Sequence, residues 1–217
     1  MTRMLVLLAA LAGVARADVA GDLAAIERDA PTCAADRAHC IGIALHVAGD
    51  ASAVVTPDWV AAQLAGANRH FAPLDLGFQL ASVDALPAAA LHVATRAERS
   101  ALAVGRVRGR VIDVFVVGQL DDIDRERNTI RGVTWRTRDG RKFVILSADA
   151  LERTLAHELG HVFGLPHSTY AISIMNKTER DDPPMEQRTF APEELAAMRP
   201  VLRRMLRAGE LVDLAKP

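Results

Sequence analysis

The chain has 217 residues, of which 50% are hydrophobic, 24% charged and only 4% aromatic, and its formal net charge is −1. This length and composition predict one globular domain with a largely aliphatic core. The near-neutral charge argues against nucleic acid or an anionic membrane surface as a partner.

The first 17 residues have the pattern of a signal peptide. Arg3 is followed by a short apolar run from Leu5 to Val14, and then by an A-x-A cleavage signal that ends at Ala17. The apolar run is too short to span a bilayer as a helix. We therefore expect cleavage after Ala17, a secreted or periplasmic protein that begins at Asp18, and no membrane anchor.

The next segment, residues 18–40, contains a short helical stretch over 18–31 and the chain's two cysteines, Cys33 and Cys40. In an exported chain, two cysteines this close together predict a disulfide bond. The alternative is that one thiol ligates a metal ion in a latent precursor. A disulfide is the simpler use of two thiols in an oxidising compartment.

From residue 41 onward, strands and helices alternate. Thr56-Pro57-Asp58 is a typical helix start, and Asp139-Gly140 is a favoured hairpin turn. Pro200 should kink or split the last helix. Strands are expected over 40–47, 77–83, 111–117, 132–136 and 142–147, and helices over 56–71, 96–103, 148–163 and 192–207.

This order predicts an α/β fold over residues 41–217. A mixed twisted sheet with two main helices would form an upper lobe that ends at about residue 164. Residues 165–217 would form a smaller, irregular lower lobe closed by the C-terminal helix.

The most informative string runs from His157 to His167 and reads H-E-x-x-H-x-x-G-x-x-H. In a helix, His157 and His161 lie on one face about a turn apart, so both imidazoles can reach one ion. Gly164 permits a turn with positive φ, which allows His167 to return as the third ligand. The pattern predicts a Zn²⁺ site with one open position.

Ordinary core or surface histidines on a helix are the alternative explanation. The chain has seven histidines, and three of them fall within these eleven residues, which argues against it. Glu158 is offset from the ligand row, so it can face a water bound to the metal. Glu158 is therefore the candidate general base.

The string resembles the zinc-binding signature of the metzincin metallopeptidases. Those enzymes also have a methionine-containing turn, and Met175 in Ser173-Ile174-Met175-Asn176 matches it. The resemblance implies that Met175 forms a floor beneath the histidines without binding zinc. The subfamily is open. Ser168, directly after the third histidine, resembles the matrixin pattern, whereas the compact layout is more like that of the pappalysins.

Two features depart from parts of that clan. Lys177 stands two residues after Met175, where astacin-like and serralysin-like members have a tyrosine ligand. There is also no room for a large propeptide between Ala17 and the first strand, so a long inhibitory pro-domain is not expected.

The resemblance implies a zinc endopeptidase that acts on protein or peptide substrates, and we expect it to be a monomer. By position, Gly132, Val133, Thr134 and Trp135 would be the edge strand that pairs with substrate, although an ordinary edge strand is an equal alternative. Other functions left open are a non-catalytic zinc-containing peptide-binding module and a hydrolase of cell-wall peptides. Asp121, Asp122 and Asp124 could bind Ca²⁺, but they lack a full calcium-loop pattern.

Overall fold

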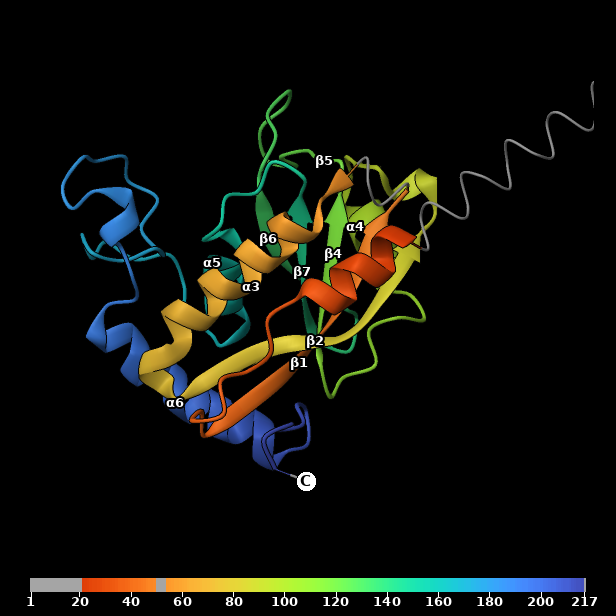
Figure 1. The fold of residues 1–217 in the computed structure, drawn as a ribbon. Helices are drawn as coiled ribbons and strands as arrows, with labels where there is room; N and C mark the ends of the chain where they lie inside the picture. The colour runs from red at the N-terminus through yellow and green to blue at the C-terminus, as the bar shows by residue number, and fades with distance from the viewer. Residues whose placement is uncertain (1–20, 50–53, 217) are drawn as a thin grey trace, which may run out of the picture.

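The computed structural model describes residues 21–49 and 54–216 (Figure 1). The expected signal peptide, residues 1–17, lies outside the described residues. Residues 21–29 are helical, within the stretch where the sequence predicts a helix.

A five-stranded mixed sheet forms the centre of the molecule. Its strands are β1 (His39–Ala48), β2 (Leu76–Leu86), β4 (Ile112–Val117), β6 (Gly132–Arg136) and β7 (Lys142–Ser147). Their order is β2-β1-β4-β7-β6, and every neighbouring pair is parallel except β6 and β7. Strand β4 is buried along its whole length, as expected for a strand covered on both faces. The mixed sheet predicted from the sequence is therefore confirmed.

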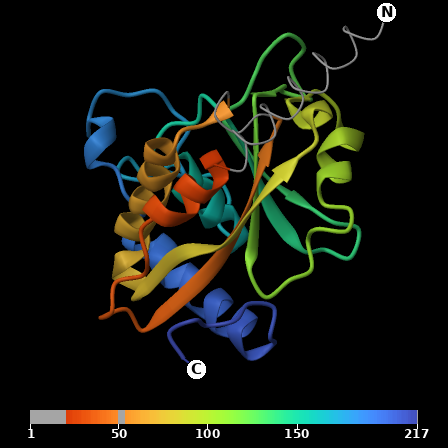
Figure 2. The same cartoon turned by 45° about the vertical axis from the view of Figure 1, so that its right-hand side comes forward.

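Besides the helix over residues 21–29, the described chain has the helices α3 (Pro57–Phe71), α4 (Arg96–Leu102), α5 (Thr154–Val162) and α6 (Pro192–Arg207) around the sheet. Helices α3 and α5 lie on one side of the sheet and α4 lies on the other (Figure 2). The start of α3 is as predicted, because the Thr56 hydroxyl accepts a hydrogen bond from the Trp59 N–H at 3.2 Å. In the described part of the chain, no helix is both long and apolar enough to cross a membrane.

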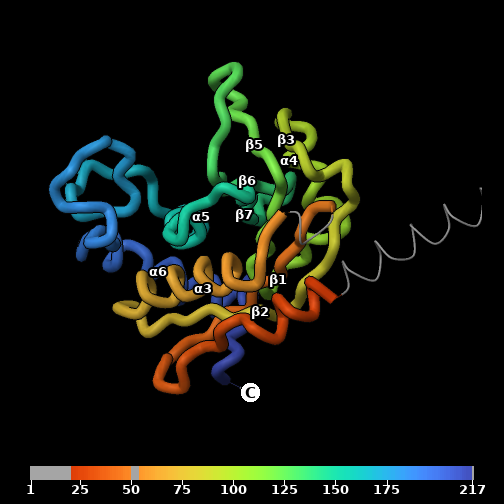
Figure 3. Tube along the Cα trace, turned by 45° about the horizontal axis from the view of Figure 1, so that its top comes forward, coloured from red at the N-terminus to blue at the C-terminus, as the bar shows by residue number. Residues whose placement is uncertain are grey.

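Some elements differ from those expected. Two short strands, β3 (His92–Val93) and β5 (Gln119–Leu120), form a separate parallel pair that the sequence does not predict. The loop between β5 and β6 projects beyond the sheet (Figure 3). The sequence predicts that Pro200 kinks or splits the last helix; α6 continues through Pro200, so the proline does not split it.

Helix α5 also begins later than predicted, at Thr154 instead of residue 148. The reason is Gln63 on α3. Its side-chain amide donates to the carbonyls of Ala150 and Leu151, and its oxygen accepts from the Leu155 N–H at 3.1 Å. Gln63 thereby satisfies backbone groups at the helix start in place of a local cap.

Aromatic side chains join the sheet, both main helices and the C-terminal part of the chain. The Phe71 ring packs against Phe78 at 5.1 Å, Phe163 at 5.6 Å and Phe190 at 4.9 Å between centroids. All four phenylalanines are at most 2% exposed. This cluster fixes the end of α5 against the chain that follows it.

Two contacts secure the start of β1. Cys33 and Cys40 form the predicted disulfide, with their Cα atoms 6.0 Å apart. The Asp213 carboxylate accepts from the Cys40 N–H at 2.9 Å and contacts the His39 ring at 2.7 Å. The disulfide supports an oxidising compartment for this protein.

Buried His70 predicts a loss of stability in acid. Its ring is 5% exposed and contacts the Thr189 hydroxyl, and burial, reinforced by Arg69, lowers its pKa to about 4. Between pH 6.5 and 4 the unfolded chain then binds more protons at this residue than the folded chain does. The free energy of unfolding should therefore be unaffected by His70 titration above pH 6.5. It should fall by about 1–2 kcal/mol by pH 5, after a discount for partial solvent screening.

Urea unfolding of the wild-type protein and of His70→Gln, at pH 7.5 and pH 5, measures this effect. The wild type should lose more stability than the variant over that interval, because the other titrating groups are common to both. Equal losses in the two proteins would contradict the prediction.

Candidate active site

The end of α5 directs the third histidine back toward the first two. Gly164 has φ +98°, as predicted, a conformation that side chains disfavour. The Gly164 N–H donates to His161 O, and the Leu165 N–H donates to Gly160 O, which together form a Schellman ending. The chain then turns, and His167 returns beside the helix.

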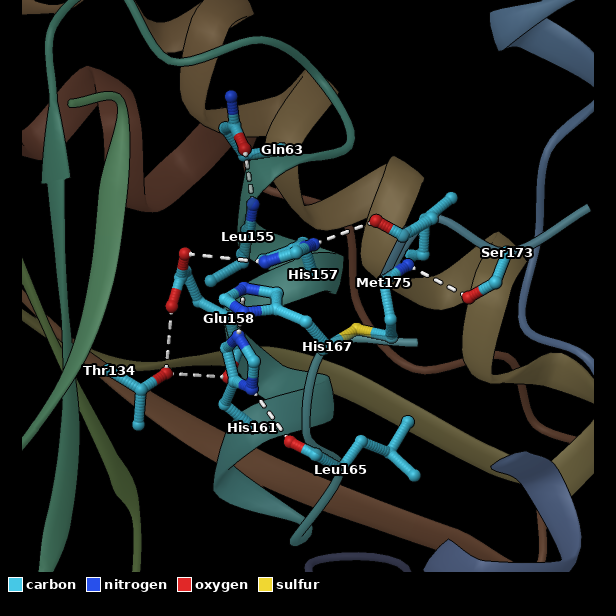
Figure 4. A network of polar contacts seen from close by, with 11 residues as sticks. Gln63, Thr134, Leu155, His157, Glu158, His161, Leu165, His167, Ser173 and Met175 are labelled. Atoms are coloured by element: carbon cyan, nitrogen blue, oxygen red, sulfur yellow. Dashed lines mark hydrogen bonds and ion pairs between the residues drawn. The ribbon is translucent and has the colours of Figure 1, made fainter. Parts of the chain in front are cut away.

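The three histidines meet at one point (Figure 4). One ring nitrogen from each of His157, His161 and His167 lies within 4.8 Å of the others. The Nε2 atoms of His161 and His167 are 3.2 Å apart. Among the described residues, this is the group of side chains arranged to hold a metal ion.

Backbone carbonyls set the orientation of two of these rings. His157 Nδ1 lies 2.7 Å from Ile174 O, and His161 Nδ1 lies 2.7 Å from Leu165 O. A carbonyl oxygen only accepts, so each Nδ1 carries the proton and each Nε2 turns a free lone pair toward the centre. Tetrahedral Zn²⁺ with Zn–N bonds of about 2.0–2.1 Å holds its nitrogens about 3.4 Å apart. The donor set and the observed 3.2 Å separation therefore fit zinc.

The surroundings keep the imidazoles neutral, as metal ligands must be. Burial lowers the pKa of His157 to about 4, although its bond to Ile174 acts in the opposite direction. Burial, with nearby Lys177, lowers the pKa of His167 to about 4. Burial also lowers the pKa of His161.

Glu158 is buried beside this centre. Its Oε1 lies 4.0 Å from His157 Nε2, and its Oε2 lies 2.9 Å from the Thr134 hydroxyl on β6. That hydroxyl also lies 2.8 Å from the Glu158 carbonyl, so its single proton can serve either oxygen. Burial raises the pKa of the Glu158 carboxyl to about 7, and the Thr134 hydrogen bond partly opposes this.

Met175 packs directly beneath the helix that carries the histidines. It is fully buried, and its Sδ lies 2.8 Å from the position that a Cβ on Gly160 would occupy. A side chain at residue 160 would collide with Met175. The Ser173 hydroxyl accepts from the Met175 N–H at 2.9 Å and donates to the buried carboxylate of Glu194, which fixes the turn.

The histidines and Glu158 line a cleft of about 1380 Å³. Gly132, Val133 and Thr134 form one wall, so the structure brings most of the expected edge strand to the site. Trp135 points elsewhere. Its indole N–H donates to Ser100 Oγ at 3.1 Å, and the Arg99 guanidinium lies 5.2 Å from its ring, both on α4.

The structure gives no support to a calcium site at Asp121, Asp122 and Asp124. Asp121 pairs with His92 at 2.9 Å, and Asp124 pairs with Arg96 at 2.8 Å. Over residues 21–49 and 54–216, these aspartates do not gather into a group that could hold a metal.

The sequence does not show the contact between Thr134 and Glu158, because strand and helix meet only in the fold. Lys177 is a second residue of the site that the sequence does not identify. It lies close enough to lower the pKa of Glu158 and of the histidines. The one signal for it was its place two residues after Met175.

Comparisons with known proteins agree with this geometry. The model of the matrixin family matches residues 118–193, about a third of the chain, which include the three histidines and Met175. Metalloproteinase-II from Bacteroides fragilis is similar in structure, with a TM-score of 0.53 and 12% identity over 80% of this chain and 55% of that one. Archaemetzincin from Methanopyrus kandleri has a TM-score of 0.53 and 16% identity over 77% of this chain and 98% of that one.

This chain thus spans about half the length of the Bacteroides protein. A search of curated protein sequences finds no significant match. The structural neighbours confirm the zincin fold predicted from the sequence. Together with the family match, they confirm the metzincin resemblance and support a zinc metallopeptidase.

Proposed function

We propose that this protein is an exported zinc endopeptidase that cleaves extended protein or peptide substrates. The observation that carries the proposal is the convergence of three neutral imidazoles beside a buried glutamate, in a cleft next to a sheet edge. His157, His161 and His167 would hold the ion. Bound zinc supplies a Lewis acid and acidifies water.

Glu158 has the features of a general base. Its carboxyl faces the point where the histidines converge, and burial brings its pKa close to neutral. Such a group can accept a proton from the attacking water and return it to the leaving amine near pH 7. The Thr134 hydroxyl holds one carboxyl oxygen, which leaves Oε1 free to face the reacting atoms.

The outer edge of β6 can bind an extended chain. Ser147 N–H donates to Arg131 O, and Thr137 N–H donates to Arg141 O, so odd-numbered residues bond inward to β7. Bonding alternates along a strand, and the even-numbered residues Gly132, Thr134 and Arg136 therefore turn their backbone groups outward. In the described part of the chain no strand covers this edge. Substrate would add there by β-augmentation.

A peptide library incubated with the zinc-loaded protein tests the proposal. We expect cleavage within peptide chains, detected by mass spectrometry as new termini, and no cleavage after a chelator removes the metal. Peptide binding without hydrolysis would favour the non-catalytic module. Cleavage confined to cell-wall cross-links in a parallel assay would favour the cell-wall hydrolase.

Export is the remaining part of the proposal. The signal-peptide pattern before Asp18 supports it, and the disulfide is consistent with an oxidising compartment. N-terminal sequencing of exported protein should give Asp18 as the first residue. Any other first residue contradicts the expected cleavage site.

A further inference from the structure

A second pocket, of about 360 Å³, opens beside His157. It lies between the start of α5 and the chain that follows Met175. Four of its lining residues are cationic, namely Arg131, Arg153, Lys177 and Arg188, whereas Glu179 is its single acidic lining residue. We refer to it as the basic pocket.

Among the described residues, no carboxylate forms an ion pair with Arg188, the most buried of these cations. Arg188 is only 3% exposed, and its guanidinium donates to Pro183 O at 3.0 Å and to Arg180 O at 2.6 Å. Both acceptors are neutral carbonyls. The arginine is therefore anchored in place while its charge stays uncompensated, an arrangement that favours an incoming anion.

The other cations are also available to a ligand. Across residues 21–49 and 54–216, neither Arg153 nor Lys177 forms an ion pair. Arg131 has only an exposed, long contact of 3.9 Å with Asp149. Burial, followed by the positive charges of Arg131 and Arg188, lowers the pKa of Arg153. Together with Arg188, these residues place four cations around one small pocket.

The sheet edge determines which part of a substrate reaches this pocket. Antiparallel pairs outnumber parallel pairs about two- to three-fold, so we take the substrate as antiparallel to β6. Its chain would then run from the Arg136 end of β6 toward the Gly132 end, next to which Arg131 lines the basic pocket. The residue that arrives there follows the cleaved bond.

We propose that the basic pocket binds a carboxylate of the residue that follows the cleaved bond. The carboxylate is either the side chain of Asp or Glu, or the free C-terminus of a short substrate. This inference rests on the proposed peptidase function and names its substrate class. Charge-assisted hydrogen bonds from arginine and lysine would provide the selectivity.

Matched peptides test the inference. A blocked peptide from a library cleavage site is made with Glu, Gln or Lys after the cleaved bond. With the zinc-loaded full chain, kcat/KM for the Glu peptide should exceed that for the Gln peptide about tenfold or more. The Gln peptide is also made to end at that residue, as a free acid and as an amide. A preference for the Glu side chain identifies an acidic residue as the ligand, and a preference for the free acid identifies the chain terminus.

Charge reversal then locates the selectivity. In Arg153→Glu and Lys177→Glu, the ratio of kcat/KM for the Glu peptide to that for the Gln peptide should fall toward one. The kcat/KM for the Lys peptide should rise relative to that for the Gln peptide. Each ratio is measured on a single protein preparation, so partial loss of folded protein does not alter it. Arg203→Glu, which reverses an exposed charge on α6, should keep the wild-type ratio.

Two failures can be told apart. If wild type cleaves the Glu and Gln peptides equally, and the free-acid and amide peptides equally, the proposed carboxylate ligand is excluded but the peptidase function is not. If the zinc-loaded protein cleaves no peptide, the proposed function fails. The pocket is then tested alone with the Glu158→Ala variant. Fluorescence anisotropy measures how tightly this variant binds blocked alanine octapeptides that contain either one Glu or one Gln. Tighter binding of the Glu peptide, or of a Gln peptide that ends in a free acid over the same peptide that ends in an amide, supports the proposal. Equal binding within both pairs overturns it.

Discussion

The Glu158→Ala variant is expected to lose peptide hydrolysis and to keep its zinc. Glu158 contributes no atom to the histidine cluster, since the converging nitrogens belong to His157, His161 and His167. Its removal takes away the group placed to accept a proton beside them. General acid–base catalysis contributes about 10²–10⁴-fold, so kcat/KM should fall by a factor in that range.

Stopped peptide assays and metal analysis of the same preparation measure the two effects separately. Glu152→Ala is the matched control, because that exposed glutamate pairs with Arg69 on the surface at 2.8 Å and lies outside the cleft. It should keep both zinc and activity. Zinc-dependent hydrolysis at the wild-type rate in Glu158→Ala would rule out the proposed role of this residue.

The His161→Ala variant is expected to lose both zinc and activity. His161 is held between two partners, with Nδ1 bonded to Leu165 O and Nε2 facing His167 Nε2. Removal leaves two of the three nitrogen donors. Loss of an outer-shell partner typically weakens metal binding about 10–100-fold, and loss of a ligand itself should weaken it further.

Thermal unfolding gives a readout that needs no substrate. Zinc should raise the Tm of the wild-type protein, because an ion that binds only the folded state stabilises it. It should not raise the Tm of His161→Ala. His92→Ala, which removes an exposed histidine paired with Asp121, serves as the control and should respond like wild type. An equal zinc response in His161→Ala would exclude His161 as a ligand.

The histidine cluster could be predicted from the sequence because its geometry is local. Two residues four apart in a helix share a face whatever surrounds them, and a glycine with positive φ can redirect the chain within three residues. The sheet was also predictable, since buried strands such as Ile112–Val117 consist, apart from Asp113, of β-branched or aromatic residues.

Features that depend on distant contacts could not be predicted. The start of α5 is set by Gln63, which lies 92 residues before Leu155. The basic pocket combines Arg131, Arg153 and Arg188, which no sequence pattern links. The Trp135 side chain was expected at the substrate edge, but the pleat of β6 turns it toward α4.

The contact between the two ends of the fold orders events during synthesis. Asp213 bonds to the backbone of Cys40, and the Leu214 N–H donates to Cys40 O at 2.7 Å. Strand β1, the neighbour of both β2 and β4, therefore gains these bonds only after residues 213 and 214 have been made. A growing chain that contains His157 to His167 but not yet residues 213 and 214 therefore lacks this closure.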